Sequence, residues 1–120
     1  MNIEQLRNYC LTKRGVTEHF PFDEDVLVFK VGNKMFLLTS LKSWEENEAA
    51  INVKCDPDYA VELRANYESV EPGYHMSKIH WNTIRLYKGE LTIPLVKQFI
   101  DDSYNLIVKS LPKKIRETLQ

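Results

Sequence analysis

The chain has 120 residues, of which 43% are hydrophobic and 28% are charged, and its formal net charge is −1. This length and balance predict a single folded domain over residues 1–120 and exclude a disordered chain. No apolar run approaches the ~20 residues needed to span a bilayer, and the start shows no basic region followed by an apolar run. We therefore expect a cytoplasmic protein without a membrane segment.

Charge is distributed unevenly along the chain. Residues 1–71 contain 8 Lys and Arg against 13 Asp and Glu, whereas residues 72–120 contain 8 against 4. The C-terminal portion can therefore present a cationic face to a polyanion, because local potential rather than net charge steers a partner. Alternatively, the two portions interleave in the fold and neutralise each other.

The N-terminal segment is predicted to form one amphipathic helix over residues 2–13. Within it, Ile3, Leu6 and Cys10 recur at helical spacing. Residues 17–25 follow as a turn that ends in an acidic bend.

Two strands joined by a tight turn are predicted next, over residues 26–31 and 34–38. Gly32-Asn33 between them is typical of a two-residue hairpin loop of type II′. This register places Phe29 opposite Phe36 on the core side. Both faces of the hairpin are rather apolar, so we expect it to be central in a sheet or covered.

The remaining elements complete an α+β fold, an antiparallel sheet with helices packed on it. In chain order they are a loop over 41–47, a third strand over 50–55, a helix over 56–66, a fourth strand over 81–87, a long helix over 92–110 and a short basic helix over 112–119.

The two cysteines, Cys10 and Cys55, are far apart in the sequence and are expected to be free thiols. Cys55 comes just before a predicted helix, whose dipole would favour the thiolate. It also alternates with Ile51 and Val53 on the apolar side of its strand, which predicts a buried, inert thiol. Cys10 belongs to the apolar stripe of the first helix and has the same interpretation.

Patterns typical of metal sites and enzymes are incomplete in this chain. His75 and His80 have the spacing of zinc-finger histidines, but no pair of cysteines accompanies them. No Gly-x-Ser-x-Gly elbow and no glycine-rich phosphate loop occur. We therefore expect no metal, no cofactor and no enzymatic activity.

The segment 72–84 and the fourth strand concentrate aromatic, imidazole and cationic side chains. Such side chains can stack on bases while they neutralise phosphates. Alternatively, the aromatic rings are core residues under the long helix and the cations line its rim. The strand residues predicted to share one face are Trp81, Thr83, Arg85 and Tyr87, and His75, Lys78 and His80 belong to the loop before them.

Several segments are similar to those of one known family. They are Pro72–Met76 with Lys78, His80–Ile84, Asp102–Val108, Ser110–Lys114, and, nearer the start, Arg7–Leu11, Glu18–Phe22 and Phe29–Val31. They are distributed over essentially the whole length of the chain, and on them the chain resembles the MmcQ/YjbR family of small bacterial proteins.

This resemblance implies a CyaY-like, frataxin-related α+β fold with a double-wing DNA-binding architecture, and a DNA-binding, regulatory role. The frataxin likeness also suggests iron binding as an alternative role. Frataxins, however, have an acidic first helix, whereas Glu4 is the only acidic residue of the helix predicted here. The alternative function is a protein- or small-ligand-binding module with no nucleic-acid role, and a monomer is favoured. The residues expected to contact DNA are Tyr74, His75, Lys78, His80, Trp81, Arg85 and Lys88.

Overall fold

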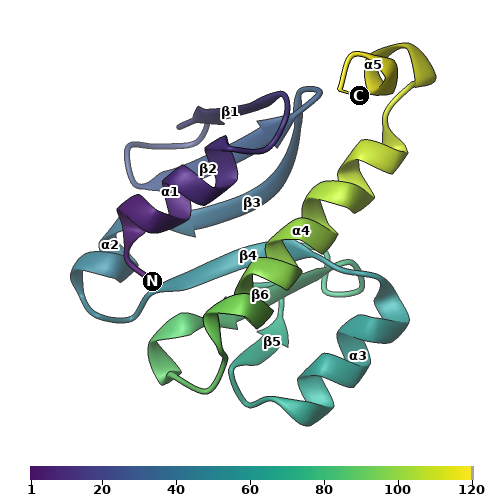
Figure 1. The fold of residues 1–120 in the computed structure, drawn as a ribbon. Coiled ribbons are helices and arrows are strands. Elements are labelled where there is room, and N and C mark those ends of the chain that lie inside the picture. Colours follow the sequence, from purple (N-terminus) through teal and green to yellow (C-terminus); the bar gives the residue numbers. More distant parts are fainter. Residues whose placement is uncertain (120) are drawn as a thin grey trace.

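The computed structural model describes residues 1–119 and contains one six-stranded antiparallel sheet with helices packed against it (Figure 1). The strand order is β1-β2-β3-β4-β6-β5. The expected α+β fold is therefore confirmed. The strands are β1 Val16–His19, β2 Val26–Val31, β3 Lys34–Ser40, β4 Ala50–Lys54, β5 Val70–Pro72 and β6 Trp81–Arg85; the helices are α1 Ile3–Leu11, α2 Leu41–Glu45, α3 Pro57–Asn66, α4 Ile93–Ser110 and α5 Lys113–Glu117, with a short 3-10 helix, η1, at Leu86–Lys88.

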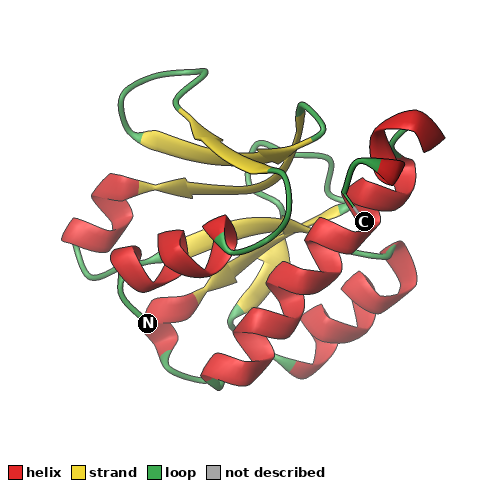
Figure 2. Cartoon of the chain, turned by 45° about the horizontal axis from the view of Figure 1, so that its top comes forward, coloured by secondary structure: helices red, strands yellow, loops and turns green. Residues whose placement is uncertain are grey.

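Helices α1 and α4 lie on one face of the sheet, and α3 packs beside β5 (Figures 1 and 2). The hydrophobic core fills the space between these helices and the sheet, because each helix turns its apolar stripe inward. None of the helices in the described part of the chain crosses the opposite face of the sheet. Core side chains include Leu6, Cys10, Phe29, Leu37, Ile51, Ile84, Phe99 and Ile100.

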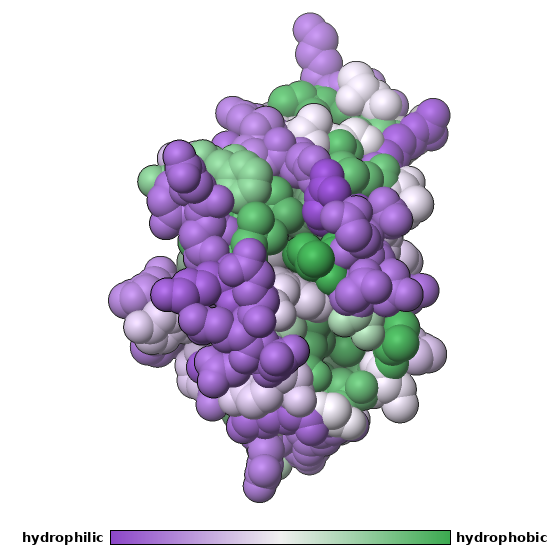
Figure 3. All heavy atoms as spheres, turned by 90° about the vertical axis from the view of Figure 1, so that its left-hand side faces the viewer, coloured by the Kyte–Doolittle hydropathy of each residue, from purple (hydrophilic) through white to green (hydrophobic). Residues whose placement is uncertain are grey.

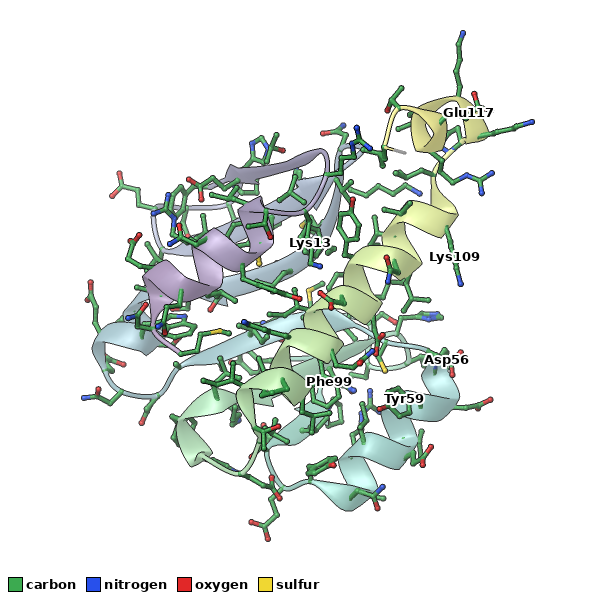
Figure 4. The ribbon with its side chains drawn as sticks, viewed as in Figure 1. Lys13, Asp56, Tyr59, Phe99, Lys109 and Glu117 are labelled. Carbon is green, nitrogen blue, oxygen red and sulfur yellow. The ribbon has the colours of Figure 1, made fainter. Side chains whose placement is uncertain are left out.

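Polar contacts join α1 to α4 above the core. The Tyr9 hydroxyl donates to the Asp101 carboxylate at 2.6 Å, and the Lys13 ammonium pairs with the same carboxylate. The Tyr104 hydroxyl donates to the main-chain oxygen of Arg14 at 2.6 Å. Figure 4 shows Lys13 between the end of α1 and α4. These contacts fix the spacing of the two helices over the sheet.

The β2–β3 hairpin differs from its predicted geometry. Gly32 and Asn33 have φ of 56° and 66°, which is a type I′ turn rather than type II′. A β-bulge shifts the register between Phe29 and Lys30, so Phe29 pairs with Leu37 and not with Phe36. The predicted Phe29–Phe36 cross-strand pair is therefore wrong, although both rings lie in the core with centroids 6.5 Å apart.

Three short elements were not predicted, namely β1, α2 and β5. The segments 17–25 and 41–47, expected to be turn and loop, contain most of β1 and all of α2. These elements have only three to five residues, which is too short to show a period. The predicted strand 81–87 ends at Arg85, because η1 follows and is closed by Gly89 in the left-handed region.

The side chain of Ser103 joins β3 to β4 where the two strands separate. These strands pair only at Leu37–Val53 and Leu38–Asn52, and they diverge beyond that point (Figure 1). There the fully buried Ser103 hydroxyl donates to the Phe36 oxygen at 2.5 Å and accepts from the Lys54 amide at 2.8 Å. One hydroxyl on α4 thus satisfies two backbone groups that the sheet leaves unpaired.

We expect Ser103→Ala to lower the free energy of unfolding by about 1–3 kcal/mol, because the half-buried Lys54 N–H and the buried Phe36 C=O lose their partner. Urea unfolding measures this loss. Ser110→Ala is the matched control, since that exposed hydroxyl donates within its own helix to Ile107. Equal stability of the two variants would contradict the bridging role.

Candidate nucleic-acid interface

The face of the sheet opposite α1 and α4 is called here the open face. One row of paired residues crosses all six strands on this face: His19, Val28, Leu38, Asn52, Thr83 and Glu71. A second set, nearer the β2–β3 turn, consists of Lys30 beside Met35 and Lys54 beside Trp81. Paired residues of antiparallel strands project to the same side, so the rows define one surface.

Two loops border the open face and line one pocket on it. They are the β1–β2 loop, residues 20–25, and the β5–β6 loop, residues 73–80. The pocket has a volume of about 360 Å³, and Phe22 and Tyr74 line it from opposite loops with 63% and 65% of their surface exposed. Its other apolar lining comes from Val26, Met35, Leu38 and Met76.

The β5–β6 loop is held in place at its start by hydrogen bonds to β6. The Thr83 hydroxyl accepts from the Tyr74 amide at 3.0 Å and donates to the Asn52 side-chain oxygen at 2.6 Å. The Gly73 amide donates to the Trp81 oxygen at 2.8 Å. Thr83 is buried and therefore positions the loop rather than contacting a partner.

Arg64 on α3 holds the other end of this loop. Its Nε donates to the Asn82 side-chain oxygen at 2.7 Å, and its Nη2 donates to the main-chain oxygens of Lys78 at 2.5 Å and Trp81 at 3.1 Å. A guanidinium suits this role because it offers several donors in a fixed geometry. The loop is thus anchored at both ends, and within it the Lys78 ammonium donates to the Gly73 main-chain oxygen at 3.3 Å.

Six of the seven predicted DNA-contacting residues lie on the open face or in its bordering loop. Four of them, Tyr74, His75, Lys78 and His80, are exposed. The ring centroids of Tyr74 and His75 lie 4.0 Å apart. Trp81 and Arg85 are half-buried on β6. The last, Lys88, lies beyond the far end of β6 in η1 and is not part of this cluster.

Tyr87 was predicted to share one strand face with Trp81, but it lies in η1, after the end of β6, with 46% of its surface exposed. Trp81 pairs with Lys54 on the open face and is not among the core residues under α4. The interpretation in which both rings pack beneath the long helix is therefore wrong. Only side chains on the core side of β6 can be buried under α4, and that side carries Ile84 rather than the two rings.

Charges on the open face differ between its two ends. Lys30, Lys54 and Lys78 lie towards the β2–β3 turn and form no ion pair with residues 1–119. Arg85 is paired with Glu71, so its charge is largely compensated. Three residues of this face were not predicted from the sequence, namely Lys30, Lys54 and Phe22. The two lysines could have been assigned to the open face, because they alternate with buried residues along their strands.

Carboxylates of the β1–β2 loop take part in the loop's own structure. Asp23 accepts hydrogen bonds from the amides of Asp25 and Val26. Asp25 accepts from the Ser40 hydroxyl at 2.6 Å and from the Lys42 amide at 2.8 Å. These bonds fix the loop that presents Phe22 and connect it to the start of α2.

The predicted buried thiols are confirmed. Cys10 and Cys55 are free and buried, and burial raises their pKa to about 12 and about 11. Both thiols stay protonated at neutral pH, which makes them poor nucleophiles. Within residues 1–119, no three His, Cys, Asp or Glu side chains are grouped so that they could hold a metal ion. None of the helices in that range has the length and apolarity to cross a membrane.

Comparison with known proteins gives one consistent family. The YjbR family model matches residues 11–106. The uncharacterized protein YbdF of Escherichia coli O157:H7 is 40% identical over 96 residues, which are 79% of this chain and 75% of that protein. The uncharacterized protein YjbR of Escherichia coli K12 is 31% identical over 119 residues, which are 99% of this chain and 98% of that protein.

Solved structures agree with this result. The Deinococcus radiodurans protein DR2400, described with a DUF419 domain, has a TM-score of 0.88 at 33% identity, covering 98% of this chain and 87% of that one. A Pseudomonas syringae protein has a TM-score of 0.74 at 27% identity, covering 88% of this chain and 98% of that one. The similarity therefore extends over nearly the whole fold.

Gly73→Ala is expected to displace the β5–β6 loop, because a Cβ there would lie 2.8 Å from the Trp81 Cβ and 3.0 Å from the Trp81 oxygen. Amide chemical shifts and hydrogen exchange over residues 74–81 measure the displacement. Gly89→Ala is the control, since its Cβ would meet nothing within 4 Å and only its φ of 68° is strained. An unperturbed loop in Gly73→Ala would contradict the close packing.

Proposed function

The chain belongs to the YjbR family, and we propose that it is a cytoplasmic, non-enzymatic regulatory protein that binds single-stranded DNA on its open face. The proposal rests on one observation: exposed aromatic rings and lysines that form no ion pair with residues 1–119 occur together on the sheet face opposite α1 and α4. Its proposed contact residues are Tyr74, His75, Lys78, His80, Trp81 and Arg85, with Phe22, Lys30 and Lys54 added from the geometry.

Phosphate binding is assigned to the end of the open face near the β2–β3 turn. Lys30 and Lys54 occupy equivalent positions on two parallel-running strands, and Lys78 extends the same end from the loop. Because no carboxylate pairs with them among the described residues, these ammonium groups are available to replace counterions on a nucleic acid.

Base binding is assigned to Tyr74 and Trp81, beside these cations, and to Phe22 in the loop at the other end of the open face. Tyr74 and Phe22 are mostly exposed, and Trp81 is half-buried next to Lys54. Rings at this exposure can stack on unpaired bases, whereas bases inside a duplex are covered by their neighbours. The arrangement therefore favours a single strand over a duplex.

The salt dependence of binding tests the phosphate contacts. We expect the double variant Lys54→Ala/Lys78→Ala to weaken binding of a single-stranded oligonucleotide and to reduce the slope of log K against log salt by about 1.4, since each phosphate contact contributes about 0.7. Fluorescence anisotropy at several salt concentrations gives both values. Lys42→Ala/Lys109→Ala, which removes two exposed lysines on α2 and α4, is the charge-matched control. No binding at low salt, or an equal effect of this control variant, would refute the assignment.

Stacking is tested by replacing one exposed ring. Tyr74→Ala is expected to cost about 1–3 kcal/mol of binding free energy, the usual contribution of one stacked base. The matched control is Tyr87→Ala, because that tyrosine is also exposed but lies in η1 outside the face. Titration of the same oligonucleotide against both variants gives the difference, and equal affinities would rule out stacking at Tyr74.

A small apolar ligand is the second candidate function. The pocket between the two loops, about 360 Å³ with Met35, Leu38 and Met76 in its lining, is large enough for one. Such a ligand would bind independently of salt and of Lys54 and Lys78. The salt titration therefore separates the two functions.

A further inference from the structure

A second pocket lies on the helix side of the sheet, between α1, β1 and α2, away from the open face. Its volume is about 430 Å³, and its apolar walls come from Ile3, Phe20, Leu41 and Trp44. Figure 3 looks onto this side of the molecule and shows apolar surface between hydrophilic borders. We propose that this pocket binds a small organic cation, a protonated amine on an apolar body.

The apolar walls are pre-formed by hydrogen bonds around α2. The indole N–H of Trp44 donates to the Thr39 hydroxyl at 2.8 Å, which fixes the ring. The Leu41 amide donates to the main-chain oxygen of Asp25 at 3.0 Å and so ties α2 to the β1–β2 loop that contains Phe20. A pocket of this size that needs no rearrangement can enclose the apolar body of a small ligand.

The rim of the pocket has an excess of negative charge. It contains Glu4, Glu18 and Glu45 but only one cation, Arg7. Arg7 donates to both oxygens of Glu18 at 3.1 and 2.7 Å and contacts Glu4 at 3.2 Å. The hydrogen bond from Arg7 is the main reason that the pKa of Glu18 is lowered, so Arg7 and Glu18 both stay charged at neutral pH.

Glu45 has no ion pair or hydrogen-bond partner for its carboxylate among residues 1–119. Arg7 is shared between Glu18 and Glu4, so three carboxylates face one guanidinium and the rim keeps an excess of negative charge, which attracts a cation and repels an anion. Aromatic walls add to this preference, because a cation is attracted to the face of an aromatic ring. The pocket is therefore suited to an amine and unsuited to DNA phosphates.

The charge of the ligand is tested with three probes of similar shape: 2-phenylethylammonium, 2-phenylethanol and phenylacetate. Each is titrated into the isotope-labelled full chain, and amide and indole shifts give the dissociation constants. The proposal expects the ammonium probe to shift the signals of Arg7, Phe20 and Trp44 and to bind at least ~5-fold tighter than the other two. Absence of these shifts, or equally tight binding of the alcohol, would overturn it.

Two variants test the rim itself. Glu45→Gln and Glu4→Gln are expected to weaken binding of the ammonium probe about 3- to 5-fold each, with the alcohol unaffected. Glu48→Gln is the matched control, because this exposed carboxylate follows α2 and does not line the pocket. Loss of affinity in Glu48→Gln equal to that in the rim variants would also overturn the proposal. Because both sites are tested with separate ligands, failure here leaves DNA binding at the open face unaffected.

Discussion

The rest of the structure depends on the contact that the Ser103 hydroxyl makes at the junction of β3 and β4. The two strands diverge after two residue pairs, and the hydroxyl supplies the hydrogen bonds that the ladder lacks. Without it, the Phe36 C=O and the Lys54 N–H would lack a hydrogen-bond partner, which lowers the stability of the fold. The contact also sets α4 across the sheet, and the bonds of Tyr9 and Lys13 to Asp101 then place α1 beside it. Both helices therefore occupy one face and leave the other open.

Sheet order determines what the open face displays. Because β1 pairs with β2 at one edge and β5 with β6 at the other, the loops 20–25 and 73–80 rise on either side of the same surface. Their rigidity has different sources: aspartates bond the first loop to α2, whereas Arg64 and Thr83 anchor the second. Rings on anchored loops lose little freedom on binding, which favours a binding role for the face.

Long periodic elements were predictable from the sequence, and short ones were not. Helices α1, α3 and α4 and the strands β2 and β4 were expected within a few residues of their bounds, because their apolar periods and caps are clear. β1 and β5 exist through pairing with a neighbour, which local sequence does not specify. The bulge on β3 opposite Phe29 and Lys30 was missed for the same reason, and it places Leu37 instead of Phe36 opposite Phe29. Of the candidate site, the residues of the β5–β6 loop were predicted from the sequence, whereas Phe22 and Lys54 join them only through sheet order.

The most direct test of the central claim is to map where single-stranded DNA contacts the protein, by following amide shifts of the labelled chain during titration with a short oligonucleotide. The account predicts that the largest shifts fall on the open face and its loops, at Lys30, Lys54, Tyr74 and Trp81, while α1 and α4 change little. Shifts centred on the helix side, or none at low salt, would contradict it.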